Sequence, residues 1–319
     1  MDGGLKSFAA RPLASSGEFI KDVTGFKMET VQTEGNRTVI RLCLLGAVSL
    51  LASAFVLGGE CRAGGDWRLE WSEEFAGHEI NSAVWTFEEG WVRNNELQYY
   101  TVGRKENAKI EDGKLVITAR KERWPNRFYS PSAPTNNFKK GRAEASYTSA
   151  SLHSRGKFEF RYGRLEVKAK IPEGLGTWPA IWMCGSGMRW PKCGEIDVME
   201  AVGYRPGRVF ATTHWADLKT GKHVQKGGFK DAAPADGFHL YGIEWDENRI
   251  DYFYDGEKYH TQDISGLTDR DGFNPFRQPF FLRLNLAFGG GWGGRMGVDD
   301  TVLPARYEID YMRLYKHVD

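Results

Sequence analysis

The sequence predicts an all-β protein, a β-sandwich of the jelly-roll type, and three observations lead to this prediction. In segment after segment, apolar side chains recur at every second position, which is the spacing of a half-buried strand rather than of a helix. Glycine accounts for 38 of the 319 residues, as expected of a chain with many turns. No segment after residue 63 carries a sustained helical stripe of apolar residues. Many short strands in about 250 residues favour two packed sheets.

Two segments show the alternation most clearly. In 163–171, four apolar residues alternate with four charged ones, which buries one face of the strand and leaves the other in water. In 281–288, three Leu and Phe288 face one way, whereas Arg283 and Asn285 face the other. Further strands are expected at 67–75, 114–120, 147–153, 178–183, 194–201, 207–215, 239–246, 249–255 and 306–315.

Turn residues separate several of these strands. Asp112-Gly113 and Asp255-Gly256 predict two-residue hairpin turns, because the central positions of such turns require positive φ, which Asp and Gly tolerate. The segment 121–140 contains three prolines and shows no regular period. We expect it to be an irregular loop.

The first 63 residues are expected to be a leader rather than part of the fold. Residues 42–59 carry no charge, follow Arg37 and Arg41, and precede small residues, which is the pattern of a secretory signal peptide. This run also reaches the lower limit for a transmembrane anchor, but Gly, Ser and Ala dilute it, so a cleaved signal is favoured. The sequence therefore predicts a secreted, periplasmic or cell-surface protein with one domain over 67–319, and no stable membrane partner unless the leader stays uncleaved.

The charge balance limits the choice of partner. The chain has 43 Lys and Arg against 42 Asp and Glu, a net charge of +1, which argues against a nucleic-acid-binding protein, whose surface would be strongly basic. It also has 11 Trp, 13 Tyr and 19 Phe. Such side chains fill a core, and they also form flat apolar platforms for ligands with a C–H face, such as sugars.

Two cysteines remain beyond the leader, Cys184 and Cys193, nine positions apart across a Gly-containing loop. In an oxidising compartment a disulfide between them is plausible. Two buried free thiols are the alternative, since the spacing of the Cα atoms is not visible in a sequence. Two Cys without neighbouring His do not make a zinc site.

Three carboxylates fall within six residues of one expected strand, at Glu195, Asp197 and Glu200. On a regular strand, Glu195 and Asp197 share a face, but Glu200 would point into the core, where an ionised carboxylate is costly. A β-bulge at Val198 or Met199 would return Glu200 to the face of the other two. Bulges are frequent beside active sites for this reason.

With the bulge, the carboxyl groups of Glu195 and Glu200 can approach the ~5–5.5 Å separation of a retaining glycosidase. Asp197 then lies between them, where its charge or hydrogen bond can keep one neighbour protonated. The alternative is an acidic outer strand without a site. Three clustered carboxylates close in sequence to Trp178, Trp182 and Trp190 favour catalysis.

The segments around this strand resemble glycoside hydrolase family 16, of the laminarinase (endo-1,3-β-glucanase) type. The resemblance covers essentially all of 67–319. Its motifs are NNELQYYT (94–101), KLVITARKE (114–122), YTSASL (147–152), YGRLEVKAKIP (162–172), GTWPAIWM (176–183), WPKCGEIDVME (190–200), FHLYGIEWD (238–246), NLAFGGGWGG (285–294) and YEIDYMRLY (307–315). It implies a concanavalin-like jelly roll with an open concave cleft and a retaining double displacement. By position, Glu195 resembles the nucleophile, Asp197 the assisting carboxylate and Glu200 the acid/base.

The form of the acidic motif narrows the resemblance. The bulged E-x-D-x-x-E pattern is that of laminarinases, agarases and carrageenases, and the motifs at 94–101 and 176–183 favour a laminarinase, which implies a β-1,3-glucan substrate. A mixed-linkage β-1,3-1,4-glucanase, a red-algal galactanase and a non-catalytic β-glucan-binding protein are the alternatives. Lys168 departs from the Arg of many related sequences, and a lysine there cannot make the bidentate hydrogen bonds of an arginine.

The resemblance and the strand faces also indicate residues that contact the substrate. Trp190 resembles the stacking platform beside the cleavage point, and Trp178 and Trp182 face away from Ile181 and Met183. His214 resembles a position near the acid/base. The full set of expected contacts is Trp190, Trp178, Trp182, His214, Asn94 and Asn285.

No cofactor is expected for catalysis. The resemblance implies a structural calcium on the convex side, near Asp310, although no dense run of oxygen ligands is visible there. The expected partner is a polysaccharide, and the expected state is a monomer.

Overall fold

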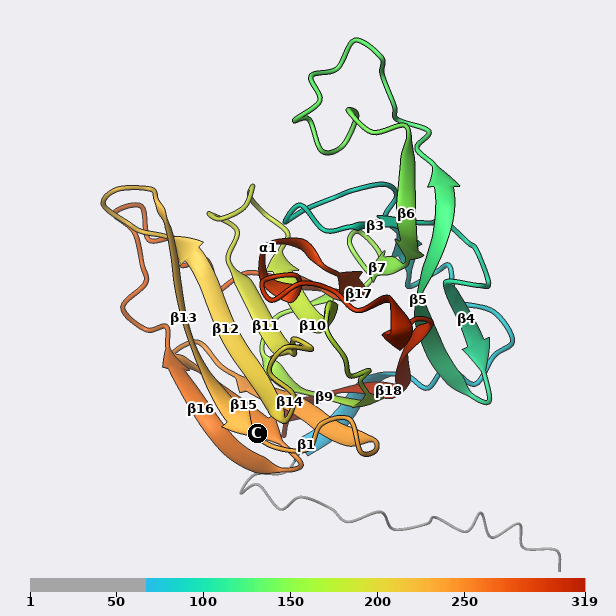
Figure 1. Ribbon diagram of the computed structural model, residues 1–319. Coiled ribbons are helices and arrows are strands. Elements are labelled where there is room, and N and C mark those ends of the chain that lie inside the picture. The colour runs from blue at the N-terminus through green and yellow to red at the C-terminus, as the bar shows by residue number, and fades with distance from the viewer. Residues whose placement is uncertain (1–66, 319) are drawn as a thin grey trace, which may run out of the picture. The chain divides into compact units, whose positions relative to one another are not determined.

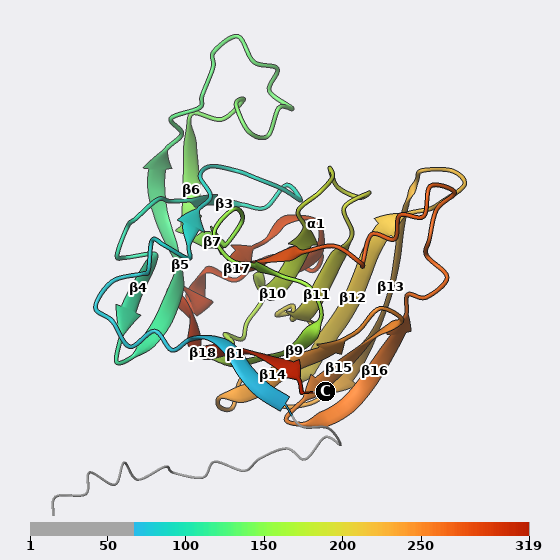
Figure 2. The ribbon, with the colours of Figure 1, turned by 180° about the vertical axis from the view of Figure 1, so that it is seen from behind.

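The computed structural model describes residues 67–318, which form two β-sheets packed face to face (Figures 1 and 2). The first sheet has ten strands, in the order β16 (Glu257–Asp263), β15 (Arg249–Tyr254), β14 (His239–Trp245), β9 (Gly163–Lys170), β18 (Ala305–His317), β5 (Lys114–Pro125), β6 (Glu144–Ser149) and β3 (Gln98–Tyr100), with β1 (Trp67–Glu73) beside β18 and β4 (Ala108–Glu111) beside β5. The predicted all-β sandwich is confirmed.

The second sheet has eight strands and carries the face that matters for function. Its order is β13 (His223–Asp231), β12 (Arg208–Ala216), β11 (Glu195–Glu200), β10 (Thr177–Gly185), β17 (Phe280–Phe288), β7 (Ser151–His153) and β2 (Thr86–Phe87), with β8 (Glu159–Phe160) beside β17. The helical elements of the described chain are α1 (Gly290–Gly293) and the 3-10 turn η1 (Asp300–Val302).

The core lies between the two sheets and is built by the predicted alternation. Leu165 and Val167 of β9 face Leu284 and Leu286 of β17 within one apolar cluster, and all four are fully buried. Burying a side chain of this size contributes about 1.5–3 kcal/mol. Trp215 belongs to the same cluster. The other face of β17 is thereby left for polar residues.

Both predicted hairpin turns are present. Asp112 and Gly113, between β4 and β5, have φ of 51° and 69°. Asp255 and Gly256, between β15 and β16, have φ of 47° and 78°. Two successive positive φ values define the type I′ turn, whose twist matches that of the strands it joins.

Some elements differ from the prediction. The expected strand 147–153 is divided at Ala150, so that β6 pairs in the first sheet and β7 in the second. β5 continues to Pro125, which leaves 126–143 as the irregular loop that projects beyond β5 and β6 (Figure 1). Strands β13 and β16 were not predicted, because their sequences are polar on both faces and show no period of two.

The predicted leader, 1–63, lies outside the described residues. Within 67–318, no helix is long and apolar enough to cross a membrane. The division into a leader and one domain stays a prediction.

Gly203, three residues after the end of β11, lies in tightly packed surroundings. A Cβ added at Gly203 would lie 1.6 Å from the carbonyl oxygen of Gly174, whereas one added at Gly237 would meet nothing within 4 Å. We expect Gly203→Ala to lower the free energy of unfolding by about 1–3 kcal/mol and Gly237→Ala to change it by less than about 0.5 kcal/mol. Urea unfolding followed by Trp fluorescence measures both, and equal midpoints would contradict the packing described.

Candidate active site

The acidic strand β11 contains the predicted bulge. On β10, Ile181 pairs with Met199 but the next residue, Trp182, pairs with Asp197. The register shifts again on the β12 side, between Asp197 and Glu200. The extra residue lets Val198 and Met199 both enter the core, which is why Glu200 returns to the outer face. The predicted position of the bulge is confirmed.

A cavity of about 1010 Å³ lies over the outer face of β10 to β13 and β17. Glu195, Asp197 and Glu200 all line it. So do all six residues expected to contact the substrate: Trp178, Trp182, Trp190, His214, Asn94 and Asn285. Residues that are up to 191 positions apart in the sequence therefore meet in one place.

The three carboxyl groups cannot all ionise in this setting. Burial, and then the charge of Asp197, raise the pKa of Glu195 to about 8, although His214, Arg93 and Arg283 oppose this. Burial also raises the pKa of Asp197. The pKa of Glu200 is raised well above its usual range, again by burial first and then by Asp197. When neighbouring carboxyl groups differ in the positive charges around them, their pKa values differ, and one can act as the acid and the other as the base.

Glu200 is held by a tryptophan. Trp178 Nε1 donates a hydrogen bond to Glu200 Oε1 at 2.9 Å. The Trp178 ring itself meets Trp292 edge to face, with centroids 5.4 Å apart, and Trp292 meets Phe210 in the same way at 5.1 Å. This aromatic group fixes the direction in which the Glu200 carboxyl points.

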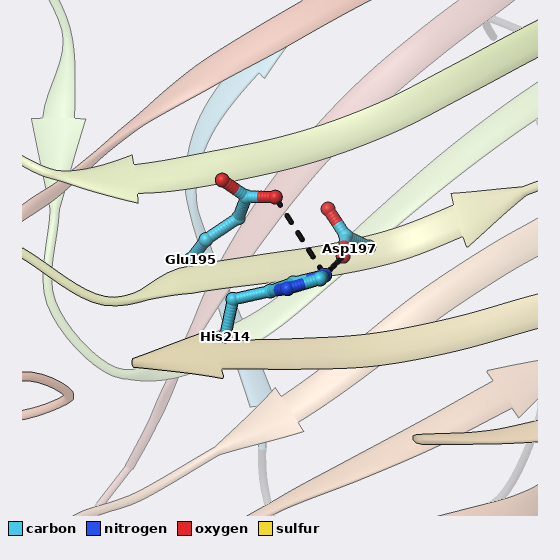
Figure 3. Close-up of side chains that lie close together, drawn as sticks. All are labelled: Glu195, Asp197 and His214. Atoms are coloured by element: carbon cyan, nitrogen blue, oxygen red, sulfur yellow. Dashed lines mark ion pairs between the residues drawn. The ribbon is translucent and has the colours of Figure 1, made fainter. Parts of the chain in front are cut away.

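Asp197 and Glu195 share a histidine (Figure 3). His214, on β12, places its Nε2 3.0 Å from Asp197 Oδ2 and 3.8 Å from Glu195 Oε1. Asp197 Oδ2 is buried and accepts no hydrogen bond from the described residues. In enzymes without substrate, such contacts are often loose and tighten when the substrate binds.

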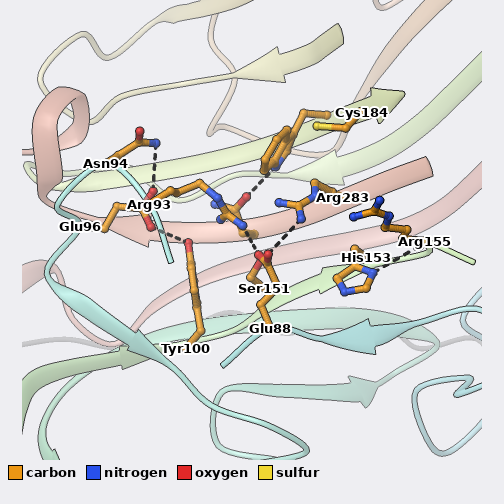
Figure 4. A network of polar contacts seen from close by, with 12 residues as sticks. Glu88, Arg93, Asn94, Glu96, Tyr100, Ser151, His153, Arg155, Cys184 and Arg283 are labelled. Carbon is orange, nitrogen blue, oxygen red and sulfur yellow. Dashed lines mark hydrogen bonds and ion pairs between the residues drawn. The ribbon is translucent and has the colours of Figure 1, made fainter. Parts of the chain in front are cut away.

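A network of charges beside the carboxylates was not predicted (Figure 4). Glu88 forms ion pairs with Arg93 and with Arg283, the latter at 3.0 Å, and accepts a 2.6 Å hydrogen bond from Ser151. Burial would raise the pKa of Glu88, but the two Arg charges outweigh it and lower the pKa to about 2. Arg283 shares a strand face with Asn285, a signal that the sequence did contain. Arg93 and Glu88 carry no such signal.

Trp182 is more enclosed than expected of a sugar platform. Its Nε1 donates to Asn285 Oδ1 at 2.7 Å. The guanidinium groups of Arg93 and Arg283 lie 5.0 and 4.5 Å from its ring, a distance typical of cation–π contacts. Asn94, at the other side, has φ of 54° and donates to Glu96. Asn285 and Asn94 thus each have a protein partner.

Trp190 differs from the other two tryptophans because it is exposed. Its exposed fraction is 51%, against 9% for Trp178 and 8% for Trp182. It lies in the loop between β10 and β11, and its ring is 4.8 Å from that of His223. An exposed indole at the edge of a cavity offers a flat apolar surface to a ligand.

The two cysteines beside the site are free thiols. Cys184 and Cys193 are both buried and unbridged, and Cys184 Sγ lies 3.8 Å from Glu195 Oε2. A hydrogen bond between the two thiols raises the pKa of Cys184 and lowers that of Cys193. Of the two alternatives drawn from the sequence, the structure contains the pair of buried thiols.

The surroundings of Asp310 do not fit the expected calcium. Asp310 Oδ2 lies 2.9 Å from the ammonium of Lys168, so a second cation there would be repelled. Calcium takes about six to eight oxygen ligands. Between residues 67 and 318, the group of at least three acidic, His or Cys side chains close enough to share an ion is Glu195, Asp197 and His214, in the cavity. We assign no calcium to Asp310.

Comparison with known proteins identifies the class to which this fold and site belong. The family model of glycosyl hydrolases family 16 matches residues 95–313. The chain therefore belongs to this family and is a glycosidase.

Individual relatives agree with this assignment. A β-glucanase of Rhodothermus marinus is 39% identical over 267 residues, which are 79% of this chain and 86% of that protein. The solved laminarinase of Rhodothermus marinus matches with a TM-score of 0.68 and 38% identity, over 81% of this chain and 100% of that one. A structure of the endo-acting O-glycanases with which human gut microbiota initiate mucin breakdown matches with a TM-score of 0.73 and 35% identity, over 82% and 94%.

Burial of Glu200 has a consequence for stability. The folded protein keeps Glu200 protonated at pH values where a Glu of the unfolded chain, with a pKa of about 4.3, is ionised. The folded state therefore binds more protons, and the free energy of unfolding falls as the pH rises above that value. We expect Glu200→Gln, which keeps an acceptor for Trp178, to reduce this fall and to be about 0.5–2 kcal/mol more stable at pH 8.

Urea unfolding at pH 5 and pH 8 measures the effect. Glu111→Gln is the control, because Glu111 pairs with Lys109 and Arg306, and these partners lower its pKa. That variant should gain no stability at pH 8. A Glu200→Gln protein with the pH dependence of the wild type would contradict the raised pKa.

Proposed function

We propose that this glycosidase is an exported endo-acting enzyme that cleaves β-1,3 linkages of a laminarin-type glucan with retention of anomeric configuration. The observation that carries the proposal is the bulge of β11, which presents three carboxylates to one large cavity. The β-glucanase and laminarinase relatives support the substrate. Export is supported by the pattern of residues 42–59 alone.

In this proposal, Glu195 attacks the anomeric carbon while Glu200 donates its proton to the departing glycosidic oxygen. The Glu195 oxygen then forms an ester bond to the sugar, and the bond to the leaving chain breaks. In the second step, Glu200 removes a proton from a water molecule, which attacks the same carbon and frees Glu195. Each step inverts the anomeric carbon, so the overall result is retention.

The surroundings of the two Glu residues support this division of roles. Glu200 is protonated because burial disfavours its charge, and its partner is the neutral Trp178 indole. His214 lowers the pKa of both groups, but Glu195 also lies within the field of Arg93 and Arg283, which lower its pKa further against the effect of burial. Of the two, Glu195 is therefore ionised more easily, as a nucleophile must be.

The cavity supports a chain-like, uncharged substrate. Its volume of about 1010 Å³ is at the upper end of the range of about 300–1,000 Å³ for small-ligand sites, so it has room for several sugar units. Trp190 provides an exposed platform for a sugar C–H face. A net charge of +1 suits a neutral glucan.

The substrate is tested by comparing glycans side by side. We expect hydrolysis of laminarin to internal fragments, slower cleavage of mixed-linkage β-1,3-1,4-glucan, and no cleavage of agarose or of mucin O-glycans. Proton NMR during the first minutes should show the β anomer as the initial product. An initial α anomer would exclude retention, and preferred cleavage of agarose or mucin glycans would replace the proposed substrate.

The role of Glu195 is tested by Glu195→Gln. This change removes the charge that attacks the sugar but keeps the size of the side chain, so we expect the rate on laminarin to fall about 10³-fold or more. Binding of laminari-oligosaccharides, measured by calorimetry, should change little. Glu106→Gln, at an exposed carboxylate that does not line the cavity, is the matched control and should keep full activity. Turnover by Glu195→Gln at the control rate would refute the role.

A further inference from the structure

A second histidine of the cavity has no role in the function proposed above. His223 lies on β13, the outermost strand of its sheet, and lines the cavity. Its Nε2 is 2.8 Å from His214 Nδ1, and the planes of the two rings differ by only 11°. The two imidazoles therefore share a hydrogen bond along their common plane, and His214 in turn faces Asp197.

A neutral His214 carries one ring proton, which is either on Nδ1 or on Nε2. If the proton is on Nδ1, it is donated to His223, and the Nε2 lone pair then faces Asp197 at 3.0 Å and Glu195 at 3.8 Å. Opposite an ionised Asp197 or Glu195, whose oxygens can only accept, that lone pair is unfavourable. If the proton is on Nε2, it lies on the side of the two carboxylates, and Nδ1 must then accept a hydrogen bond from His223.

His223 is able to donate that hydrogen bond. Its pKa is lowered by burial and then by His214, so it is neutral near pH 7 and carries one N–H. Its ring is exposed at the rim of the cavity, so the nitrogen that does not face His214 can bond to water. Apart from His214, no described residue forms an ion pair or hydrogen bond with the His223 side chain.

We propose that His223 is a positioning residue of the catalytic centre: its Nε2–H is donated to His214 Nδ1, which holds the proton of His214 on Nε2, facing Asp197 and Glu195. The N–H of His214 then stabilises negative charge on the two carboxylates as the glycosyl bond to Glu195 forms and breaks. The proposal rests on the catalytic roles assigned above. For a histidine that binds a metal, loss of the orienting hydrogen-bond partner costs about 10- to 100-fold in affinity or activity, and we expect a loss of that order here.

His223 also touches the expected sugar platform, and this contact needs to be separated from the hydrogen bond. The rings of His223 and Trp190 lie 4.8 Å apart and are tilted by 42°. Loss of this contact would disturb Trp190 and raise KM. Loss of the hydrogen bond to His214 would instead lower kcat, because it acts on the reacting groups.

Two substitutions distinguish these effects. His223→Leu keeps an apolar side chain beside Trp190 but has no hydrogen-bonding atom, so kcat on laminarin should fall about 10- to 100-fold with KM nearly unchanged. His223→Gln has an amide that can donate to His214 Nδ1, and it should restore kcat to within about threefold of the wild type. Lys222→Leu is the matched control, because Lys222 precedes His223 in the sequence but does not line the cavity. The kcat of this variant should not change.

The tautomer of His214 is measured directly by ¹⁵N NMR of histidine-labelled protein. We expect the proton on Nε2 in the wild type and in His223→Gln, and a shift toward Nδ1 in His223→Leu. A wild-type spectrum with the proton on Nδ1 would overturn the proposal, and so would a His223→Leu protein that changes only KM. Because the spectrum needs no substrate, it remains decisive even if the enzyme proves to cleave a different glycan.

Discussion

One extra residue in β11 is the constraint on which the site depends. A strand at the centre of a sandwich must fill the core with one face, and β11 does so with Ile196, Val198 and Met199. Without the bulge, Glu200 would replace one of these apolar side chains, and the core would contain a carboxyl group. With it, the same strand serves the core and the cavity at once. The rest of the site is arranged around the three carboxylates that this geometry presents.

Three largely buried carboxyl groups in one cavity are unfavourable for stability, and several neighbouring side chains offset this cost. Trp178 donates to Glu200, His214 lies between Asp197 and Glu195, and the positive charges of Arg93 and Arg283 act on Glu195. These neighbours differ in charge, so the carboxyl groups differ in how readily they ionise. The same arrangement that costs stability therefore separates the chemical roles proposed for them.

Three tryptophans of the cavity show how much of a side chain's role the sequence can predict. All three were expected to contact the substrate and all three line the cavity. Only Trp190 exposes a broad face. The indole N–H groups of Trp178 and Trp182 are bound to Glu200 and Asn285, so these two tryptophans orient polar groups as well as form a wall. Alternation along β10 predicts which way a ring points, but the partner of its N–H comes from another strand.

The sequence by itself determined the all-β class, most strands, both hairpin turns, and the bulge with its three outward carboxylates, because these depend on neighbours within a few positions of one strand. Only the tertiary structure decided what surrounds the carboxylates. Glu88, Arg93 and His223 lie on other segments and have no period or motif that marks them, and the surroundings of Asp310 argue against the expected calcium. Ionisation of a buried carboxyl depends on charges a few ångströms away in space, and those distances exist only after the two sheets have packed.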